Sequence, residues 1–445
     1  MRIIVAGASD VGTHLAKMLS NENHDIVVID PNEGNLKSLE NLDIITFHGS
    51  ATSFNVLKEA DIKRSELFIA VTQSEDTNIT AAMLGKKLGA VRTIARIDNK
   101  EYLFHANKEY FQSIGVDHLI YPENIAVREL VNLVNQTGTV DFVDFTGGKL
   151  SLFAVKLNDE SPLINKTLND TTILNSGYEY RVVAITRNTR TIIPRGNDVF
   201  ENNDLLYIIS SQSGIKELMK ISGKEQYQTK NIMILGGSRI GIGASGQLES
   251  QFNVKLIEQD KEKCFKLAGI LNNTLIVNGD GRNMNLLSEE GLPNMDTFIA
   301  VTGNSETNIL SSLLAKQLGV KRTIAEIENF DYINLAENMG IDTIINKKII
   351  AASRIFRYTR SGEVTNVKCL TGTDAEVMEF VAKKGAKVTK NKLNSINFPK
   401  DSIIGGITRG KSSFIATGDT EIKPNDRVVV FALPSAFNKL EKVFH

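Results

Sequence analysis

The chain has 445 residues, 51 of them basic and 52 acidic, so its formal net charge is −1. This length predicts three or four domains, and the balanced charge provides no long-range field for holding nucleic acid or an anionic membrane surface. The two cysteines, Cys264 and Cys369, lie far apart without a CxxC pattern, which argues against a disulfide framework or a cysteine zinc site and favours buried thiols.

The first predicted element is an apolar strand, Arg2 to Ala6, which the loop GASDVG follows directly. A glycine turn between a strand and a helix collects unpaired N–H groups and the positive end of the helix dipole, and this favours an anion. Serine stands where a dinucleotide loop usually has its central glycine, but serine is small and can donate to a phosphate oxygen. The predicted contacts of this loop are Gly7, Ala8, Ser9, Asp10, Val11 and Gly12.

Short apolar runs alternate with stretches of helical spacing over residues 1–122, which is typical of a parallel sheet covered on both faces. The second predicted strand ends at Asp30, 18 residues beyond Gly12. A carboxylate there accepts ribose hydroxyls and repels the extra phosphate of NADP, so NAD(H), ATP or ADP fit better than NADP(H). Ligands of such sheets bind at the carboxyl ends of strands, so further contacts are predicted at Gly49, Ser50, Thr72, Gln73 and Arg96.

An amphipathic helix is predicted to begin at Pro122, and a second one spans Ile349 to Phe356 at the equivalent place in the second half. The apolar face of each helix must be buried, and two alternatives are open. Each helix caps its own domain, or each packs against another subunit. With its helix, the first nucleotide-binding domain is predicted to span residues 1–138.

Strand-like runs and turn residues follow each helix and predict two small α+β modules, at 139–222 and 362–445. Ile185 to Arg187 match Ile407 to Arg409 at an offset of 222 residues, and Asp204 matches Asp426. The polar stretch 223–229 is predicted to be a surface linker between the halves. Neither module carries a specific ligand motif, so dimerisation or regulation is the predicted role.

The second half repeats the first at an offset of 230 residues, because residues 66–98 and 296–328 are identical at 17 of 33 positions. A second nucleotide-binding domain is therefore predicted at 230–361, and the fold class is α/β, with two tandem Rossmann-like, doubly wound parallel-sheet domains that each precede a small module. Arg239 replaces Asp10, so the two sites are expected to differ in nucleotide preference. The predicted second-site contacts are Gly236, Gly237, Ser238, Arg239, Ile240, Gly241, Glu258, Gly279, Asp280, Thr302 and Gly303.

Catalysis is not predicted, because no histidine recurs in the duplicate and no GxSxG, HExxH, SxxK or Walker lysine motif is present. Nucleotide binding without duplicated chemistry indicates that binding itself is the output, read through conformation. An NAD-dependent dehydrogenase that uses His14 or Arg96 is the alternative, and a scaffold with vestigial loops is a third interpretation. No metal site is predicted.

The tandem order of these domains, with FIAVTQSEDTN, RTIARI and GDTEIKPNDRVVVF, resembles the TrkA family, the cytosolic subunits of bacterial Trk potassium uptake systems. The resemblance covers essentially the whole chain. It implies RCK-type (regulator of potassium conductance) lobes, a homotetramer that forms a ring, and a membrane-embedded potassium transporter of the TrkH or TrkG type as partner. It also implies gating by NAD(H), ATP or ADP, and a cytoplasmic location on the inner face of the cell membrane.

The resemblance places the nucleotide on loop residues 7–11 and 236–240, on Asp30 and Glu258, and on Thr72, Gln73 and Arg96. The chain departs from the family pattern at Ser9 and Ser238, which replace the central glycines. It departs again at Glu326, which stands opposite Arg96 in the repeat. No apolar run approaches ~18 residues and no signal-type segment is visible, so a soluble protein of the reducing cytosol is expected.

Overall fold

The computed structural model describes residues 1–20, 24–135, 141–145, 149–173, 180–187, 190–210, 228–359, 364–370 and 375–444. The chain divides into two compact units, one made of Met1–Ile125 with Lys347–Gly362 and the other of Ala126–Asn346 with Glu363–His445. The predicted borders after residues 138, 222 and 361, and most of the predicted linker at 223–229, lie outside the described residues.

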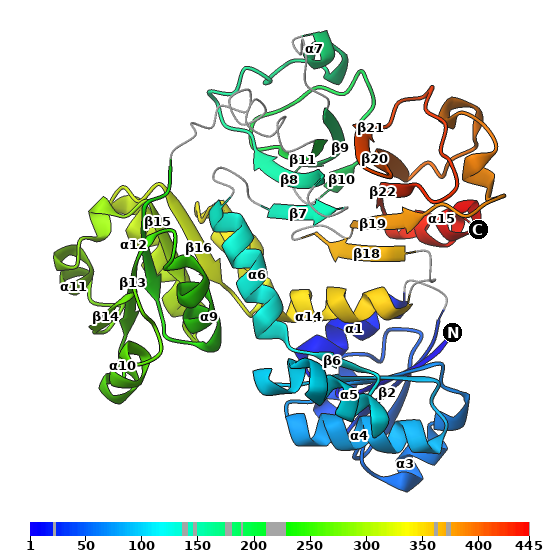
Figure 1. Ribbon diagram of the computed structural model, residues 1–445, viewed down its shortest axis with the longest axis horizontal. Helices are drawn as coiled ribbons and strands as arrows, with labels where there is room; N and C mark the ends of the chain where they lie inside the picture. Colours follow the sequence, from blue (N-terminus) through cyan, green and yellow to red (C-terminus); the bar gives the residue numbers. More distant parts are fainter. Residues whose placement is uncertain are drawn as a thin grey trace. The chain divides into compact units, whose positions relative to one another are not determined.

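The first unit contains a parallel sheet of six strands in the order β3-β2-β1-β4-β5-β6 (Figure 1). The strand order reverses between β1 and β4, and this switch point is where open α/β sheets bind ligands. The elements are β1 (Arg2–Ala6), α1 (Asp10–Ser20), β2 (Asp25–Asp30), α2 (Glu33–Lys37), β3 (Ile45–His48), α3 (Phe54–Glu59), β4 (Leu67–Ala70), α4 (Glu75–Leu88), β5 (Arg92–Arg96), α5 (His105–Ser113), β6 (His118–Ile120) and the start of α6 (Pro122–Asn135).

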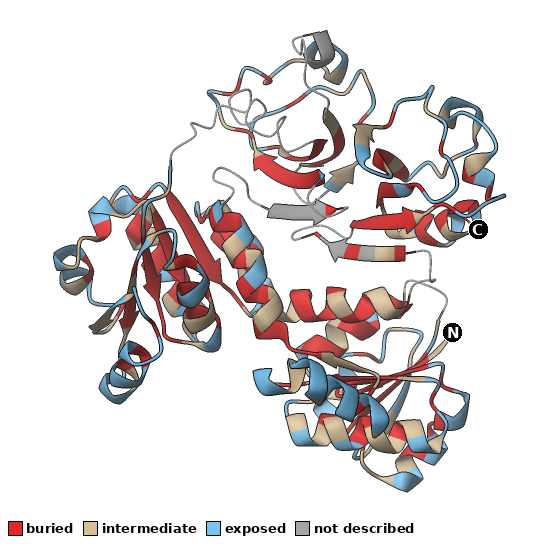
Figure 2. Ribbon diagram, in the orientation of Figure 1, coloured by how far each residue is buried: buried red, intermediate tan, exposed pale blue. Residues whose placement is uncertain are grey.

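The second unit contains a parallel sheet with the corresponding order, β14-β13-β12-β15-β16-β17. Its central strands are almost entirely buried, as expected for a sheet covered on both faces (Figure 2). The elements are β12 (Asn231–Leu235), α9 (Arg239–Leu248), β13 (Asn253–Glu258), α10 (Lys261–Ala268), β14 (Leu275–Asn278), α11 (Met284–Glu289), β15 (Thr297–Ala300), α12 (Ser305–Gln317), β16 (Arg322–Glu326), α13 (Phe330–Asn338) and β17 (Thr343–Ile345).

The two small modules are antiparallel sheets of five strands, in the orders β10-β9-β11-β8-β7 and β18-β19-β22-β20-β21. Together with the two parallel sheets they confirm the predicted fold class. Their elements are β7 (Asp141–Phe145), β8 (Leu150–Lys156), α7 (Leu168–Ile173), β9 (Tyr180–Arg187), β10 (Arg190–Ile192), β11 (Leu205–Ser210), β18 (Val364–Cys369), β19 (Glu376–Val381), β20 (Ser402–Arg409), β21 (Ser412–Ile415), β22 (Arg427–Ala432) and α15 (Phe437–Phe444).

One buried ion pair recurs in both modules. The Arg187 guanidinium holds the Asp204 carboxylate through two hydrogen bonds of 2.8 Å, and Arg409 holds Asp426 in the same way at 2.9 and 2.7 Å. Both aspartates are almost fully buried. The modules share one apolar core, in which the rings of Tyr207 and Phe431 lie with their centroids 6.1 Å apart.

The two amphipathic helices do not cap their own domains, so the first of the two alternatives drawn from the sequence is wrong. Helix α14 (Lys347–Phe356) packs along α1 and belongs to the first unit, although it follows the last strand of the second sheet. Helix α6, from Ala126 onward, belongs to the second unit, where Val127 lies against Gly243 and the Leu133 carbonyl accepts a hydrogen bond from Arg322. Each parallel-sheet domain is thus covered by the helix that follows the other domain in the same chain.

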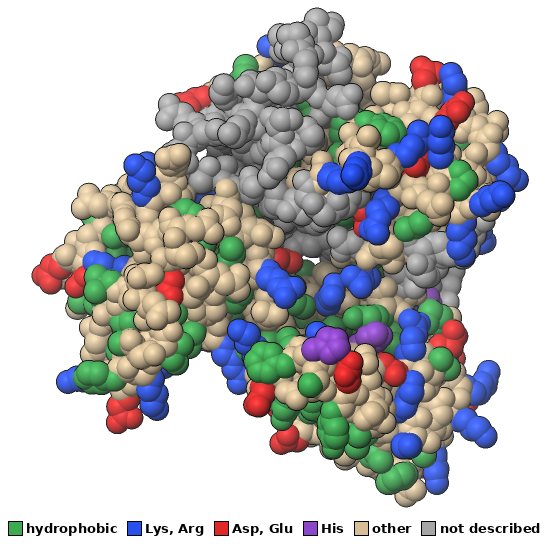
Figure 3. All heavy atoms as spheres, in the orientation of Figure 1, with side chains coloured by type: hydrophobic (Ala, Val, Ile, Leu, Met, Phe, Trp, Pro, Cys, Tyr) green, Lys and Arg blue, Asp and Glu red, His purple; other side chains and the backbone are tan. Residues whose placement is uncertain are grey.

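No described helix is long and apolar enough to cross a membrane. On the face shown in Figure 3, basic and acidic side chains lie among one another on both parallel-sheet domains, in keeping with the net charge of −1. Charge at a binding site is therefore set by nearby residues. Cys264 is buried and free, as predicted, and the side chain of Cys369 lies outside the described residues.

Candidate functional site

Each glycine loop turns directly from the first strand of its sheet into the first helix. Gly7 has a φ of +109° and Gly236 a φ of +105°, a left-handed region that side-chain-bearing residues rarely adopt. A Cβ at Gly7 would lie 2.8 Å from the Thr72 nitrogen, and one at Gly236 would lie 2.9 Å from the Val301 carbonyl oxygen. Both the backbone angle and the available space therefore require glycine at the turn.

The last glycine of each loop brings the helix against the turn. A Cβ at Gly12 would lie 1.8 Å from the Gly7 carbonyl oxygen, and one at Gly241 would lie 2.0 Å from that of Gly236. Ser238, at the central position, is the N-cap of α9, because its hydroxyl oxygen accepts a hydrogen bond of 3.2 Å from the Gly241 N–H. Its hydroxyl proton can still be donated to a ligand.

A carboxylate at the end of the second strand holds each loop in place. Asp30 is only 5 % exposed and accepts hydrogen bonds from the N–H groups of Ala8 (2.6 Å) and Asn32 (2.8 Å). Glu258 accepts from the N–H groups of Gly237 (3.0 Å) and Asp260 (2.9 Å). A carboxylate has about four acceptor sites, so each acid has capacity left for a hydroxyl. The sequence suggested the hydroxyl contact but not this support of the loop.

Glu258 also forms an ion pair of 2.8 Å with Lys263, a contact that has no counterpart among the described partners of Asp30. Burial acts to raise the pKa of Glu258, but the hydrogen bond from the Asp260 N–H and the Lys263 ammonium outweigh it and lower the pKa. The group is therefore ionised at neutral pH. Lys263 was not predicted from the sequence, because nothing in the spacing shows that α10 turns it back toward β13.

An asparagine ties two strand ends together beside each loop. The Asn78 side chain accepts from the Thr72 N–H at 2.7 Å and donates to the Arg96 carbonyl oxygen at 3.0 Å. Asn308 makes the same contacts with Thr302 (3.0 Å) and with the Glu326 carbonyl oxygen (2.8 Å). These asparagines were also missed, although the repeated triplet Thr-Asn-Ile at 77–79 and 307–309 marks them.

The other predicted contacts of the first domain lie at the same edge of the sheet. The Gly49 N–H donates to the Asp30 carbonyl oxygen at 3.0 Å, which places the β3 loop beside the end of β2. The Ser50 hydroxyl bonds to that of Thr52 at 2.9 Å, and Gln73 is exposed. Arg96 forms an ion pair of 3.3 Å with Asp98.

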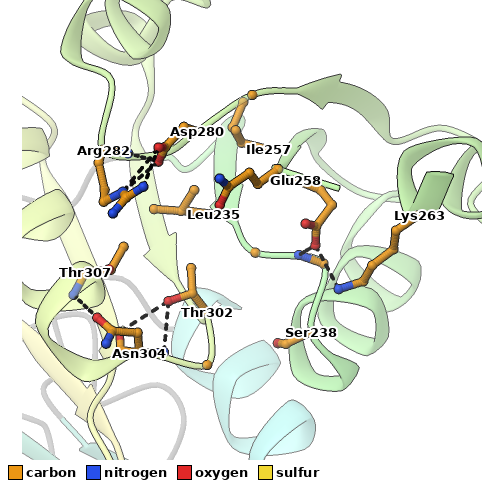
Figure 4. A pocket seen from close by; sticks show the side chains of 16 residues that line it. Leu235, Ser238, Ile257, Glu258, Lys263, Asp280, Arg282, Thr302, Asn304 and Thr307 are labelled. Atoms are coloured by element: carbon orange, nitrogen blue, oxygen red, sulfur yellow. Dashed lines mark hydrogen bonds and ion pairs between the residues drawn. The ribbon is translucent and has the colours of Figure 1, made fainter. Parts of the chain in front are cut away.

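In the second domain these loops surround a cleft of about 490 Å³, a size suited to a small ligand. In Figure 4, Glu258 and Lys263 lie on one side of the cleft, Asp280 and Arg282 lie on another, and Thr302 and Asn304 lie on a third. The cleft is lined by the predicted residues Gly236, Gly237, Ser238, Glu258, Gly279, Asp280, Thr302 and Gly303. Arg239, Ile240 and Gly241 do not line it.

Arg282 adds to this cleft a second cation that was not predicted from the sequence. It holds Asp280 through hydrogen bonds of 2.8 to 3.2 Å, and this contact lowers the pKa of the aspartate. The cleft thus offers backbone N–H groups, hydroxyls, and two cations that are each paired with a carboxylate. Groups of these kinds are suited to phosphates and ribose hydroxyls. Among the described residues, no group of three or more His, Cys, Asp or Glu side chains could hold a metal ion.

Protein families give an independent comparison. The TrkA-N domain family matches residues 3–122 and 232–347, and the TrkA-C domain family matches residues 152–223 and 377–445. The Trk system potassium uptake protein TrkA of Vibrio alginolyticus is 34 % identical over 439 residues, covering 97 % of this chain and 95 % of the relative. A TrkA homolog of Archaeoglobus fulgidus is 33 % identical over 446 residues and covers both chains completely.

Solved structures give the same fold at lower sequence identity. The crystal structure of the GsuK RCK domain is 17 % identical, with a TM-score of 0.61, and covers all of this chain and 94 % of its own. The GsuK channel bound to NAD is also 17 % identical, with a TM-score of 0.60, and covers all of this chain and 78 % of its own. At this identity the likeness shows the fold of the chain.

Proposed function

From the premise that this chain belongs to the TrkA family of Trk system potassium uptake proteins, we propose that it is the regulatory subunit of such a system. It binds an adenine nucleotide in each parallel-sheet domain and transmits the occupancy to a membrane potassium transporter. The observation that carries the proposal is the duplicated site, in which a glycine turn, a helix N-terminus and a strand-end carboxylate recur with the same hydrogen bonds.

The ligands proposed are NAD(H), ADP and ATP. The turn offers N–H groups to phosphates, and the carboxylates of Asp30 and Glu258 accept ribose hydroxyls. Structures of GsuK bound to NAD and to ADP have the same fold as this chain. The cations Lys263 and Arg282 suit the second cleft to a phosphate-rich ligand.

The proposed partner is a membrane-embedded potassium transporter subunit of the TrkH or TrkG type, and the proposed assembly is a homotetramer on the cytoplasmic face of the cell membrane. The names of the relatives support the link to potassium uptake. A helix N-terminus that is drawn toward bound phosphates gives nucleotide occupancy a mechanical output. The affinity difference between the two conformations sets how far the transporter responds.

The dehydrogenase alternative is not favoured. The relatives of this chain are named for potassium uptake, and Arg96, one of the two residues that a dehydrogenase would use, is engaged by Asp98. A regulatory subunit also needs no proton donor beside a substrate, and no histidine recurs in the two duplicated sites.

Potassium flux into vesicles that contain the transporter subunit tests the proposal. Wild-type protein is expected to change the flux when ADP, ATP or NADH is added, and the double variant Asp30→Asn with Glu258→Gln is expected to lose that response. A matched double variant, Asp43→Asn with Glu262→Gln, changes exposed carboxylates of the same two domains outside the loops and keeps the response. An unchanged response in the first variant would show that the loops do not carry the regulation.

A further inference from the structure

We propose that Lys348 is a movable cation of the first glycine loop, which leaves Asp10 and contacts the phosphates when a nucleotide binds. This inference rests on the proposed function and assigns a specific residue to its regulation. Lys348 lies 338 positions beyond Asp10 in the chain, in the helix that follows the second parallel sheet. Nucleotide occupancy at the first loop would therefore act on a segment that leaves the second domain.

The ion pair places the lysine at the phosphate end of the loop. Lys348 Nζ pairs with the Asp10 carboxylate, and Asp10 is the first residue of α1. The lysine side chain is only 17 % exposed, whereas that of Asp10 is 64 % exposed. The lysine is thus held against the protein, and the carboxylate with which it pairs is exposed to solvent. Helices α1 and α14 lie side by side in this unit (Figure 1).

The position of the lysine opposes the electrostatics of its own helix. The N-terminus of α14 carries partial positive charge, yet its first turn holds Lys347 and Lys348 and no acidic residue. At the corresponding place α6 has Glu123, the favourable sign. Sequences that break a local rule in this way tend to do so at functional sites. Here the exception puts positive charge beside the loop that is proposed to bind phosphates.

The duplicated loop shows why a cation is needed there. In the second domain Arg239 opens α9, where Asp10 opens α1. A carboxylate at this position repels phosphates, so the first loop binds an anion well only if a nearby cation offsets Asp10. Lys348 supplies this charge. The phosphates and Asp10 then compete for the same ammonium group, which makes the position of α14 sensitive to the ligand.

This competition for Lys348 couples nucleotide binding at the first loop to the position of the segment that precedes α14. Because α14 begins directly after β17, a ligand that draws Lys348 away from Asp10 favours one arrangement of the segment joining β17 to α14. Thermodynamic linkage requires the opposite effect as well. Any conformation of the second domain that moves this segment must change the nucleotide affinity of the first loop. The second loop has its own cation, Arg239, within the same domain. Its nucleotide affinity therefore does not depend on a helix that follows the other domain.

Calorimetric titration of the full-length chain with ADP tests the inference, in a Glu258→Gln background that weakens the second site. Lys348→Met is expected to weaken ADP binding at the first loop about tenfold, the size of one lost charge-assisted hydrogen bond. Lys348→Arg is expected to retain binding, and Asp10→Asn to strengthen it about threefold. Lys347→Met, in the same helical turn, is the matched control and should leave the affinity unchanged.

Lys348→Met and Asp10→Asn are expected to change ADP affinity in opposite directions, and this result distinguishes a ligand-binding lysine from a purely structural one. If the ion pair only fastens α14 to α1, then Lys348→Met and Asp10→Asn both lower thermal stability and neither changes ADP affinity, which overturns the inference. Should Lys348→Met fail to fold, Lys348→Gln takes its place in the titration, and an unchanged ADP affinity in that variant overturns the inference. If the wild-type chain binds no ADP at all, the proposed function itself fails, and this result is distinct from a chain that binds ADP independently of Lys348.

Discussion

The two parallel-sheet domains have the same glycine-loop backbone and differ in the charged residues around it. Both loops turn on a left-handed glycine, and both are fixed by a carboxylate that accepts a loop N–H. In the first loop, Asp10 pairs with a lysine from α14; in the second, Arg239 begins α9 outside the cleft, and Lys263 and Arg282 line the cleft. Duplication thus preserved the geometry proposed to bind a nucleotide, while the surrounding charges diverged. We infer one binding chemistry with two different sensitivities.

The small modules differ from the parallel-sheet domains in this respect, because the two copies keep the same charged residues as well as the same backbone geometry. Each keeps an arginine with two hydrogen bonds to a buried aspartate. The pair fastens the loop before the last strand, since the Asp204 carboxylate also accepts the Glu201 N–H and the Asp426 carboxylate accepts the Lys423 N–H. A contact that stabilises the fold is expected to keep the same residues in both copies. The residues around a ligand site can differ between the copies.

The largest predicted effect falls on these modules. Asp204→Asn and Asp426→Asn should each lower the free energy of unfolding by about 3 kcal/mol, because the arginine loses the carboxylate that accepts its hydrogen bonds and balances its charge. The partly exposed arginines keep the cost at the low end. Denaturant unfolding of each variant measures it. Equal costs would confirm that the modules are structural duplicates, and a cost in only one module would break the comparison.

The next effect tests whether the loop backbone is equivalent in the two domains. Gly12→Ala and Gly241→Ala should each destabilise the protein by about 2 kcal/mol, because the added Cβ meets a backbone oxygen. Gly303→Ala is the control, since no atom lies within 4 Å of the position that its Cβ would take, and the stability of this variant should not change. Thermal unfolding of the three variants distinguishes a required glycine from a tolerated one.

A smaller effect tests whether the different charges of the two loops change their affinity for ADP. Arg239→Gln should weaken ADP binding at the second loop about fivefold, because the loop loses a positive charge that attracts the phosphates from outside the lining of the cleft. Titration in an Asp30→Asn background isolates that site. A Lys266→Gln variant alters an exposed cation of α10 outside the cleft and serves as the control. Unchanged affinity in Arg239→Gln would mean that the charge difference between the loops has no bearing on the ligand.

The smallest effect concerns pH. The pKa of Glu258 is lowered in the folded protein, so its ionised form contributes stability at neutral pH. This contribution is fully present above the ordinary glutamate pKa of about 4.3 and is lost as the pH falls through the lower folded-state value. Urea unfolding between pH 3 and 6 measures it. A Glu258→Gln variant should show a shallower acid dependence, and an identical profile would refute the assignment.

Much of the fold follows from the sequence because its signals are local. Apolar runs such as Arg2 to Ala6 become strands, and Gly12 and Gly241 lie where strand and helix must approach closely. The strand-end acids Asp30 and Glu258 were found from their spacing to the loops. Such features depend on residues that lie close together in the chain or recur at the offset of the repeat.

What the sequence could not show depends on distant partners. The apolar faces of α6 and α14 predict burial, but the pattern does not specify against what, so their placement on the other domain was missed. Lys348 finds Asp10 across 338 positions, and Lys263 reaches Glu258 only because α10 turns back. No periodicity encodes such contacts. Asn78 and Asn308 form an intermediate case, since the repeat marks them but does not reveal their role.

The number of nucleotide sites per chain tests the central claim most directly. Titration of the full-length protein with ADP should give two sites of unequal affinity, with Asp30→Asn weakening one and Glu258→Gln weakening the other about tenfold each, as expected for lost hydrogen bonds to a charged group. A double variant that binds two equivalents of ADP as tightly as the wild type would contradict the account.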